Sequence, residues 1–238
     1  MAVLYIIGTP IGNLGDLTYR AVEILRSIDL AVCEDTRQTL KLFNHLGIRV
    51  PLLSCRAQNE ENAAARVIAA LNKGKTAAYA SDAGTPGLSD PGSRLAAMAA
   101  AAGHEVIPIP GPSAFTAIIS AAGGSDKTVI FEGFLSPKTG RRRTRLMELL
   151  ATGWAFVLFE SPFRILKLLE DLADLGNERY VCVGREMTKV HEEYKRGSAA
   201  EIYAFFSKKE RQIGEFTLYI SGYNYKSGIY FILRNADN

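Results

Sequence analysis

The first 110 residues alternate between short apolar runs and stretches with helical spacing. Only a few fold classes are built from strands and helices in such alternation. In the stretch 18–28, for example, apolar residues recur three or four positions apart, and Thr18 is placed to cap the first turn. Strands separated by helices pair in parallel, and the helices cover both faces of the sheet. We therefore expect a parallel sheet with strands at 3–7, 30–34, 50–54, 76–80 and 104–109 and helices at 18–28, 39–46, 62–74 and 93–103.

This pattern breaks at 120–128, where small and flexible residues interrupt it. Two of the strands expected beyond the break follow each other without a helix between them, so the second half should form a mixed sheet. The expected strands are 128–133, 154–160, 179–184, 215–221 and 229–234, with helices at 143–151 and 163–176. The sequence thus predicts an α/β protein of two domains, 1–120 and 121–238, that meet in a cleft.

Composition excludes several classes of protein. At 238 residues, with 47% hydrophobic and 22% charged residues, the chain can build a substantial globular core. No stretch approaches the ~18 apolar residues of a membrane span, and the start lacks the basic segment of a signal peptide. The cysteines Cys33, Cys55 and Cys182 are odd in number and scattered, which argues against disulfides and a CxxC metal site. We expect a cytoplasmic protein without a metal or a membrane partner.

Three glycine-rich loops follow expected strands: GTPIGNLGD after 3–7, SDAGTPGLSDPG after 76–80 and PGPSA after 104–109. The carboxyl ends of parallel strands meet at one sheet edge, and glycine lets the backbone approach a ligand closely. The loops therefore predict one shared pocket, although each alone could be only a tight turn. A dinucleotide site is disfavoured because the first loop spaces its glycines as G-x-x-x-G-x-x-G, and no Walker A sequence occurs.

Eight motifs occur in order over residues 8–218: GTPIGNLGDLTYRA, CEDTRQT, SDAGTPGLSDPG, PIPGPSA, GFLSPK, ESPFR, REMTKVHEE and GEFTL. Together they resemble the tetrapyrrole methylase family, and within it the members that methylate ribosomal RNA. The resemblance implies two α/β domains with S-adenosylmethionine as methyl donor in the cleft between them. It also implies methylation of the ribose 2′-oxygen of a cytidine in 16S ribosomal RNA of the small subunit, and a homodimer.

The same motifs assign donor binding to the three loops and to two segments of the second domain. The residues are Pro10, Ser81, Asp82, Gly84, Thr85, Ser113, Ala114, Ser161, Glu215, Phe216 and Thr217. The chain departs from the family pattern at Arg56, Gln58 and Phe163, where family members carry histidines. Any proton transfer by those histidines would be missing here.

Methyl transfer from a sulfonium to a hydroxyl depends mostly on positioning, and a general base would help the ribose hydroxyl to attack. Each candidate has a structural alternative: Asp35 could pair with Arg37, Glu160 could cap a helix, and the REMTK residues could be a solvated cluster. The candidates are Glu34, Asp35, Glu132, Glu160, Glu186 and Lys189.

Residues 136–150 run from a turn into an amphipathic helix rich in cations. Arginine at a helix start opposes the helix dipole, which favours a phosphate-binding rim over a merely solvated helix start. The cations are Lys138, Arg141, Arg142, Arg143 and Arg145. Two other functions stay open: a small-molecule methyltransferase, which would leave these arginines without a purpose, and a non-enzymatic RNA-binding protein, which would leave the three loops without one.

Overall fold

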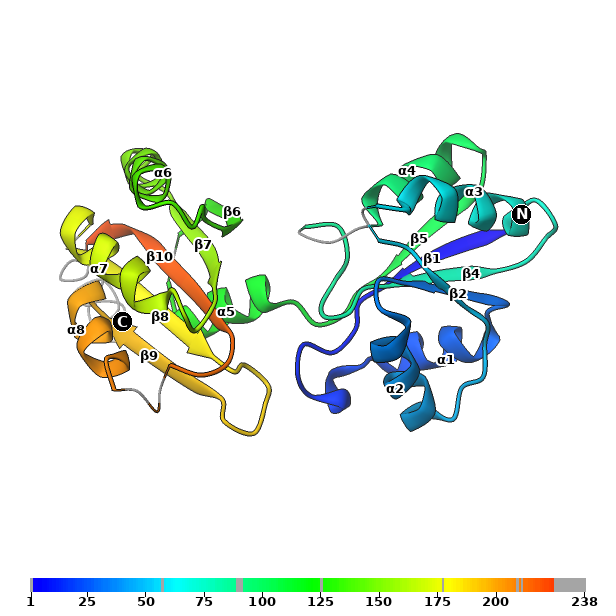
Figure 1. Cartoon of the computed structure of the whole chain (residues 1–238), viewed down its shortest axis with the longest axis horizontal. Helices are drawn as coiled ribbons and strands as arrows, with labels where there is room; N and C mark the ends of the chain where they lie inside the picture. Colours follow the sequence, from blue (N-terminus) through cyan, green and yellow to red (C-terminus); the bar gives the residue numbers. More distant parts are fainter. Residues whose placement is uncertain are drawn as a thin grey trace, which may run out of the picture. The chain divides into compact units, whose positions relative to one another are not determined.

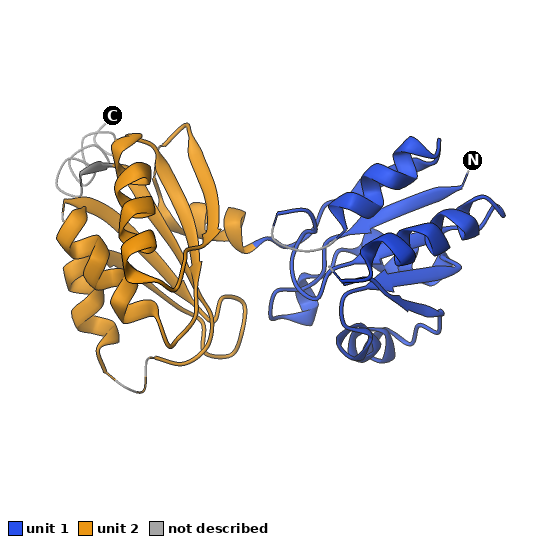
Figure 2. Ribbon diagram, turned by 45° about the horizontal axis from the view of Figure 1, so that its top comes forward, with its two compact units in different colours: residues 1–113 blue, residues 114–238 orange. Residues whose placement is uncertain are grey.

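The computed structural model describes residues 2–56, 58–88, 92–124, 126–176, 178–208, 210 and 212–224. The chain divides into two compact units, residues 1–113 and 114–238 (Figure 2). This division falls before the boundary expected at 120, because helix α5 (Ala114–Ala122) packs against strands of the second unit. The strand expected at 229–234 lies outside the described residues.

The first unit is a five-stranded parallel sheet with helices on both faces (Figure 1). Its spatial order is β3-β2-β4-β1-β5, and all neighbours pair in parallel. The strands are β1 (Val3–Ile7), β2 (Leu30–Cys33), β3 (Leu52–Ser54), β4 (Ala77–Ala80) and β5 (Glu105–Ile109), and the helices are η1 (Leu14–Asp16), α1 (Tyr19–Ser27), α2 (Thr36–Leu46), α3 (Glu60–Leu71) and α4 (Ser93–Ala101). The parallel sheet expected from the alternating pattern is confirmed.

Local signals and burial explain this arrangement. The Thr18 hydroxyl accepts a hydrogen bond from the Ala21 amide at 3.2 Å, so it caps α1 as expected. Helices α1 and α2 cover one face of the sheet, and α3 and α4 cover the other (Figure 1). The core therefore forms on both sides, with Phe43 of α2 buried on one face and Leu95 of α4 on the other.

The second unit contains a mixed sheet in the order β6-β7-β10-β8-β9. Among its described strands, only β6 and β7 pair in parallel, and β10 runs antiparallel to both of its neighbours. The elements after α5 are β6 (Val129–Phe134), α6 (Thr139–Ala151), β7 (Ala155–Glu160), α7 (Ile165–Leu175), β8 (Arg179–Arg185), β9 (Glu193–Gly197), α8 (Ala199–Phe206) and β10 (Phe216–Asn224). Leu146, Leu168 and Ile202 from three helices pack into one core with Leu218 of β10.

Three elements of this unit were not expected from the sequence: α5, β9 and α8. Strand β9 has the sequence EYKRG, with three charged residues, so its sequence does not indicate a strand that pairs with β8. Helix α8 did carry a signal, because Ser198 and Glu201 have the spacing of a capping box. The Ser198 hydroxyl accepts from the Glu201 amide, and the Glu201 carboxylate accepts from the Ser198 amide at 2.8 Å.

Candidate functional site

The three glycine loops leave one edge of the first sheet, because β4, β1 and β5 are parallel neighbours. Two backbone hydrogen bonds join the first two loops, from the Thr9 amide to the Gly84 carbonyl at 2.9 Å and back at 3.0 Å. The Thr9 hydroxyl donates to the Ser81 carbonyl at 3.0 Å, and the Ser81 hydroxyl donates to the Gly84 carbonyl at 2.9 Å. These buried hydroxyls fix the loops after β1 and β4 to each other.

The loops after β1 and β5 touch through two glycines. A Cβ added to Gly111 would lie 2.8 Å from the Gly8 carbonyl oxygen, and one on Gly8 would lie 2.9 Å from the Gly111 Cα. The Thr85 hydroxyl donates to the Pro112 carbonyl at 2.9 Å, so the loop after β4 reaches the loop after β5 as well. The three loops thus form one continuous backbone surface that side chains at positions 8 and 111 would disrupt.

A cavity of about 310 Å³ lies where the first two loops face helix α2. Three of its lining residues, Pro10, Ser81 and Asp82, are predicted donor contacts. The α2 residues were not identified from the sequence, because helical spacing alone does not show which side of α2 faces the loops. The full lining is Thr9, Pro10, Leu14, Gln38, Thr39, Lys41, Leu42, Ala80, Ser81 and Asp82.

The two carboxylates after β2 lie at the same sheet edge. Asp35 caps α2 by accepting from the Arg37 amide at 2.9 Å, and its side chain pairs with the Arg37 guanidinium. These bonds hold the pKa of the Asp35 carboxyl far below its usual range, which disfavours it as a general base. The backbone carbonyl of Glu34 accepts from Arg56 Nε at 3.1 Å, so Arg56, where the resemblance led us to expect a histidine, has a structural contact.

Glu186 and Lys189 form a cluster with Glu215 in the second unit. The Glu186 carboxylate accepts from Lys189 Nζ at 2.8 Å and from the Glu215 amide at 2.9 Å, and the Glu186 amide donates to the Glu215 carbonyl. Burial alone would raise the pKa of Glu186, but these hydrogen bonds outweigh it and lower the pKa. The same carboxylates raise the pKa of Lys189 despite its burial. A deprotonated glutamate and a protonated lysine in mutual contact favour a supporting role over proton abstraction.

The same cluster contains a strained turn. Glu186 has φ of 51°, a left-handed conformation that is costly for a residue with a Cβ. A Cβ on Gly214 would lie 2.4 Å from the Glu186 side chain, so glycine is required there. The strained turn therefore fixes the start of β10, where the resemblance expects Glu215 to Thr217 to contact the donor.

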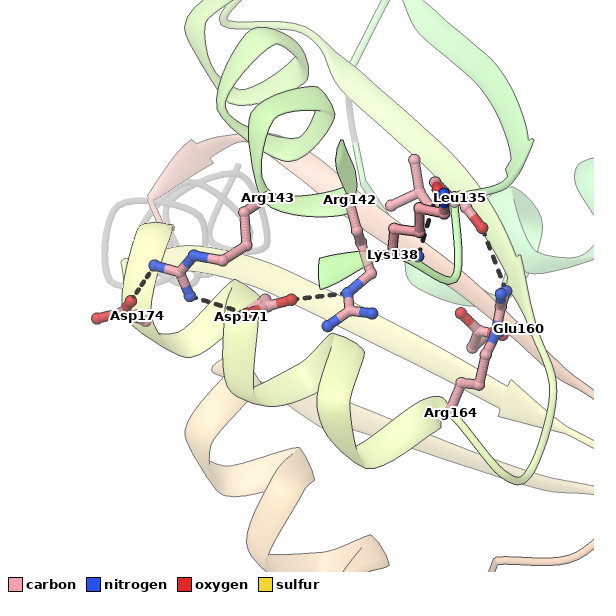
Figure 3. Close-up of polar contacts among 9 residues, drawn as sticks. Leu135, Lys138, Arg142, Arg143, Glu160, Arg164, Asp171 and Asp174 are labelled. Carbon is pink, nitrogen blue, oxygen red and sulfur yellow. Dashed lines mark hydrogen bonds and ion pairs between the residues drawn. The ribbon is translucent and has the colours of Figure 1, made fainter. Parts of the chain in front are cut away.

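Glu160 is almost fully buried at the end of β7. Its Oε1 accepts from the Ser161 amide and from Arg164 Nε, both at 2.7 Å, so it pairs with Arg164 (Figure 3). Arg164 also donates to the Leu135 carbonyl. Helix α7 begins only at Ile165, and this ion pair differs from the helix-capping role that the sequence offered as an alternative. Phe163, at another position where the resemblance led us to expect a histidine, is 92% exposed.

The cations of the segment 138–145 are mostly engaged in ion pairs (Figure 3). Arg142 is buried, and its Nε donates to Asp171 Oδ2 at 2.7 Å. Arg143 bridges Asp171 and Asp174 of α7. These pairs arise because this side of α6 packs on α7, which the sequence could not show.

Arg145 pairs with Glu132 at 2.8 Å and with Glu148. This contact also occupies Glu132, one of the candidate bases. In the described chain, Lys138 and Arg141 are the exposed cations of the segment without a carboxylate partner. Three of the five cations expected to bind phosphate, Arg142, Arg143 and Arg145, are thus engaged in ion pairs within the unit.

The remaining predicted donor contacts lie at the border of the units or in the second unit. Ser113 ends the first unit, Ala114 begins α5, and Ser161 follows β7. Phe216 and Thr217 are buried in β10, where the Phe216 ring packs edge-to-face on Phe206. That the second-unit residues join the glycine loops stays a prediction.

The described residues show neither a metal site nor a membrane-spanning helix. They contain no group of three or more histidine, cysteine or carboxylate side chains placed to hold a metal ion, and the three cysteines are buried and free. Within those residues, no helix is both long and apolar enough to cross a membrane. The glycine loops and the adjoining cavity join backbone close approach, buried hydroxyls and a carboxylate in one place.

Comparison with known proteins agrees with this geometry. The family profile described as Tetrapyrrole (Corrin/Porphyrin) Methylases matches residues 3–203. A ribosomal RNA small subunit methyltransferase I from Borrelia garinii subsp. bavariensis is 47% identical over 92% of this chain and 98% of that protein. The enzyme of the same name from Thermotoga maritima is 43% identical over 93% of this chain and 99% of its own length.

Solved structures show the same fold at low sequence identity. The uroporphyrin-III-C-methyltransferase of Thermus thermophilus superposes with a TM-score of 0.63 at 16% identity and covers 93% of this chain and 95% of its own. A cobalt precorrin-4 methyltransferase gives 0.67 at 17% identity, over 91% of this chain and 94% of its own. The resemblance carried by the eight motifs and the two-part α/β fold are both confirmed: this chain belongs to the tetrapyrrole methylase family of methyltransferases.

Proposed function

We propose that this chain transfers a methyl group from S-adenosylmethionine to the ribose 2′-oxygen of a cytidine in 16S ribosomal RNA of the small subunit. The observation that carries the proposal is the 47% identity to a ribosomal RNA small subunit methyltransferase I over nearly the full length of both chains. That similarity extends over 92% of this chain and 98% of the relative. The two solved methyltransferases named for uroporphyrin-III and cobalt precorrin-4 share the fold at 16–17% identity.

The loop geometry supports donor binding. S-adenosylmethionine supplies an electrophilic methyl group on a sulfonium cation. The close approach of Gly8 and Gly111 leaves a surface of bare backbone on which amides and carbonyls can hold the polar groups of such a ligand. Pro10, Ser81 and Asp82 line the adjoining cavity, and the Asp82 carboxylate supplies a negative charge that suits a cation.

Replacing Asp82 by alanine should weaken the binding of S-adenosylmethionine roughly 10- to 150-fold. This range corresponds to the ~1.5–3 kcal/mol of a charge-assisted contact. Titration calorimetry with the folded variant measures the effect, and Glu23→Ala is a control because Glu23 is an exposed carboxylate on α1. Unchanged donor affinity in Asp82→Ala would reduce the loop after β4 to a structural turn, since the Asp82 carboxylate also accepts from the Asp35 amide.

The proposed reaction is tested with methyl-labelled S-adenosylmethionine and small ribosomal subunits from cells that lack the activity. We expect label in 16S RNA, and nucleoside analysis should place it on the ribose of a cytidine. Subunits from cells that retain the activity should accept no label, because the position is already methylated. Label in a tetrapyrrole precursor but not in RNA would contradict the proposal.

The assay with a tetrapyrrole precursor is needed because the arginine run 141–145 no longer speaks strongly against a small-molecule substrate. Most arginines of 141–145 form ion pairs with carboxylates of the same unit, so their presence is explained without an RNA ligand. The RNA substrate therefore rests on the similar proteins and on the labelling experiment. A homodimer and a cytoplasmic location remain predictions that accompany the proposed function.

A further inference from the structure

The cavity of the first unit has two chemically different walls. One wall is made by the loops after β1 and β4, with Pro10 and Asp82. The other is made by α2, with Gln38 and Lys41. The motif resemblance gave the loop wall a role in donor binding, but it gave these two α2 residues none.

Few polar groups of the lining are free to bind a ligand. The hydroxyls of Thr9 and Ser81 donate to loop carbonyls. One Asp82 oxygen accepts from the Asp35 amide at 3.1 Å. Lys41 Nζ donates to Gln38 Oε1 at 3.1 Å, which uses one of its three donors and holds the ammonium close to α2. Among the described residues no carboxylate pairs with Lys41.

The charges divide the cavity into a negative and a positive wall. Asp82 would attract a sulfonium cation, whereas an ammonium close to the same cation would repel it. Lys41 is therefore poorly suited to hold the cationic part of the donor and well suited to an anion, for which a lysine is a common partner. The proposed RNA substrate brings such an anion beside the donor, namely the phosphate next to the target ribose.

We propose that Lys41, held in place by Gln38, binds a backbone phosphate of the RNA substrate beside the methyl-donor site. This inference rests on the proposed function. In the second unit, Arg142, Arg143 and Arg145 are engaged with carboxylates, so among the described residues of that segment only Lys138 and Arg141 stay available to phosphates. Lys41 would add a cation on the wall of a cavity shared with predicted donor contacts.

The test compares Lys41→Met with wild type by measuring the affinity for a 16S RNA fragment over a range of salt concentrations. Loss of one phosphate contact should weaken RNA binding and flatten the plot of log affinity against log salt by ~0.7–0.9. Lys41→Arg should restore most of the slope, because it retains the charge. S-adenosylmethionine affinity, measured separately by calorimetry, should not fall below the wild-type value, because the lost ammonium would only have repelled the sulfonium.

Lys73→Met is the matched control. Lys73 is exposed and precedes β4, so it lies at the sheet edge opposite the loops, and its removal should leave the salt slope unchanged. A Lys41→Met slope equal to that of Lys73→Met would overturn the inference while leaving the proposed function intact. Weaker donor binding by Lys41→Met would overturn it too, and would make Lys41 part of the donor pocket. A wild-type protein that binds the donor but no RNA would contradict the proposed function itself, and this inference with it.

Discussion

Replacing Asp171 by alanine is expected to lower the free energy of unfolding of the second unit by about 3–5 kcal/mol. Asp171 accepts from Arg142 at 2.7 Å and from Arg143 at 2.8 Å. The Arg142 side chain is only 5% exposed, so without Asp171 its charge would remain buried with no carboxylate partner among the described residues. The loss should come from this uncompensated charge and not from the small change in packing.

Urea unfolding followed by tryptophan fluorescence measures this change, because Trp154 is the only tryptophan of the chain and lies in the second unit. The control is Asp174→Ala, which removes a 63% exposed partner of Arg143 and should cost about 0–1 kcal/mol. A loss below 1 kcal/mol in Asp171→Ala, together with tighter RNA binding, would contradict the structural role. Arg142 would then turn to solvent readily, as the sequence-based prediction of a phosphate-binding rim requires.

Replacing Gly111 by alanine should reduce methyl transfer by on the order of 10²-fold, the effect of moving reacting groups by about 1 Å. The added Cβ would lie 2.8 Å from the Gly8 carbonyl oxygen, a backbone atom that cannot rotate away. The loops after β1 and β5 must therefore separate. Overpacking of this kind should also lower the free energy of unfolding by roughly 1–3 kcal/mol.

Single-turnover methyl transfer and donor calorimetry together measure this effect. The control is Gly140→Ala in α6, where an added Cβ meets nothing within 4 Å and alanine suits a helix. Gly111→Ala with wild-type donor affinity and rate would show that the Gly8–Gly111 approach serves only the fold. Weaker donor binding by Gly111→Ala without loss of stability would show that the Gly8–Gly111 approach is part of the donor site itself.

The regular part of the fold could be predicted because its signals are local. The apolar run 3–7 and the helical spacing of 18–28 can each be recognised within a short stretch of the chain, and Thr18 caps the helix that follows it. Helix α8 was missed although its capping box was present in the sequence. Strand β9 was missed because three of its five residues carry charges, and it acquires strand structure by pairing with β8.

The site was predictable only in part. Glycine loops after successive strands of a parallel sheet must meet at one edge, so the sequence identified the residues at that edge before any contact was visible. It could not show that Gly8 and Gly111 touch, nor that α2 turns Lys41 toward the same cavity as Asp82. These contacts depend on how strand order and helix rotation bring distant residues together.

The sequence by itself thus determined the alternation of strands and helices, the glycine loops and the family, all of which are encoded in short motifs. Only the tertiary structure decided the partners of the charged residues. Arg142 and Asp171 are 29 positions apart and pair because α6 packs on α7. A run of arginines looks the same in sequence whether it faces water or a buried carboxylate, because burial, which decides the cost of an unpaired charge, is a property of long-range packing.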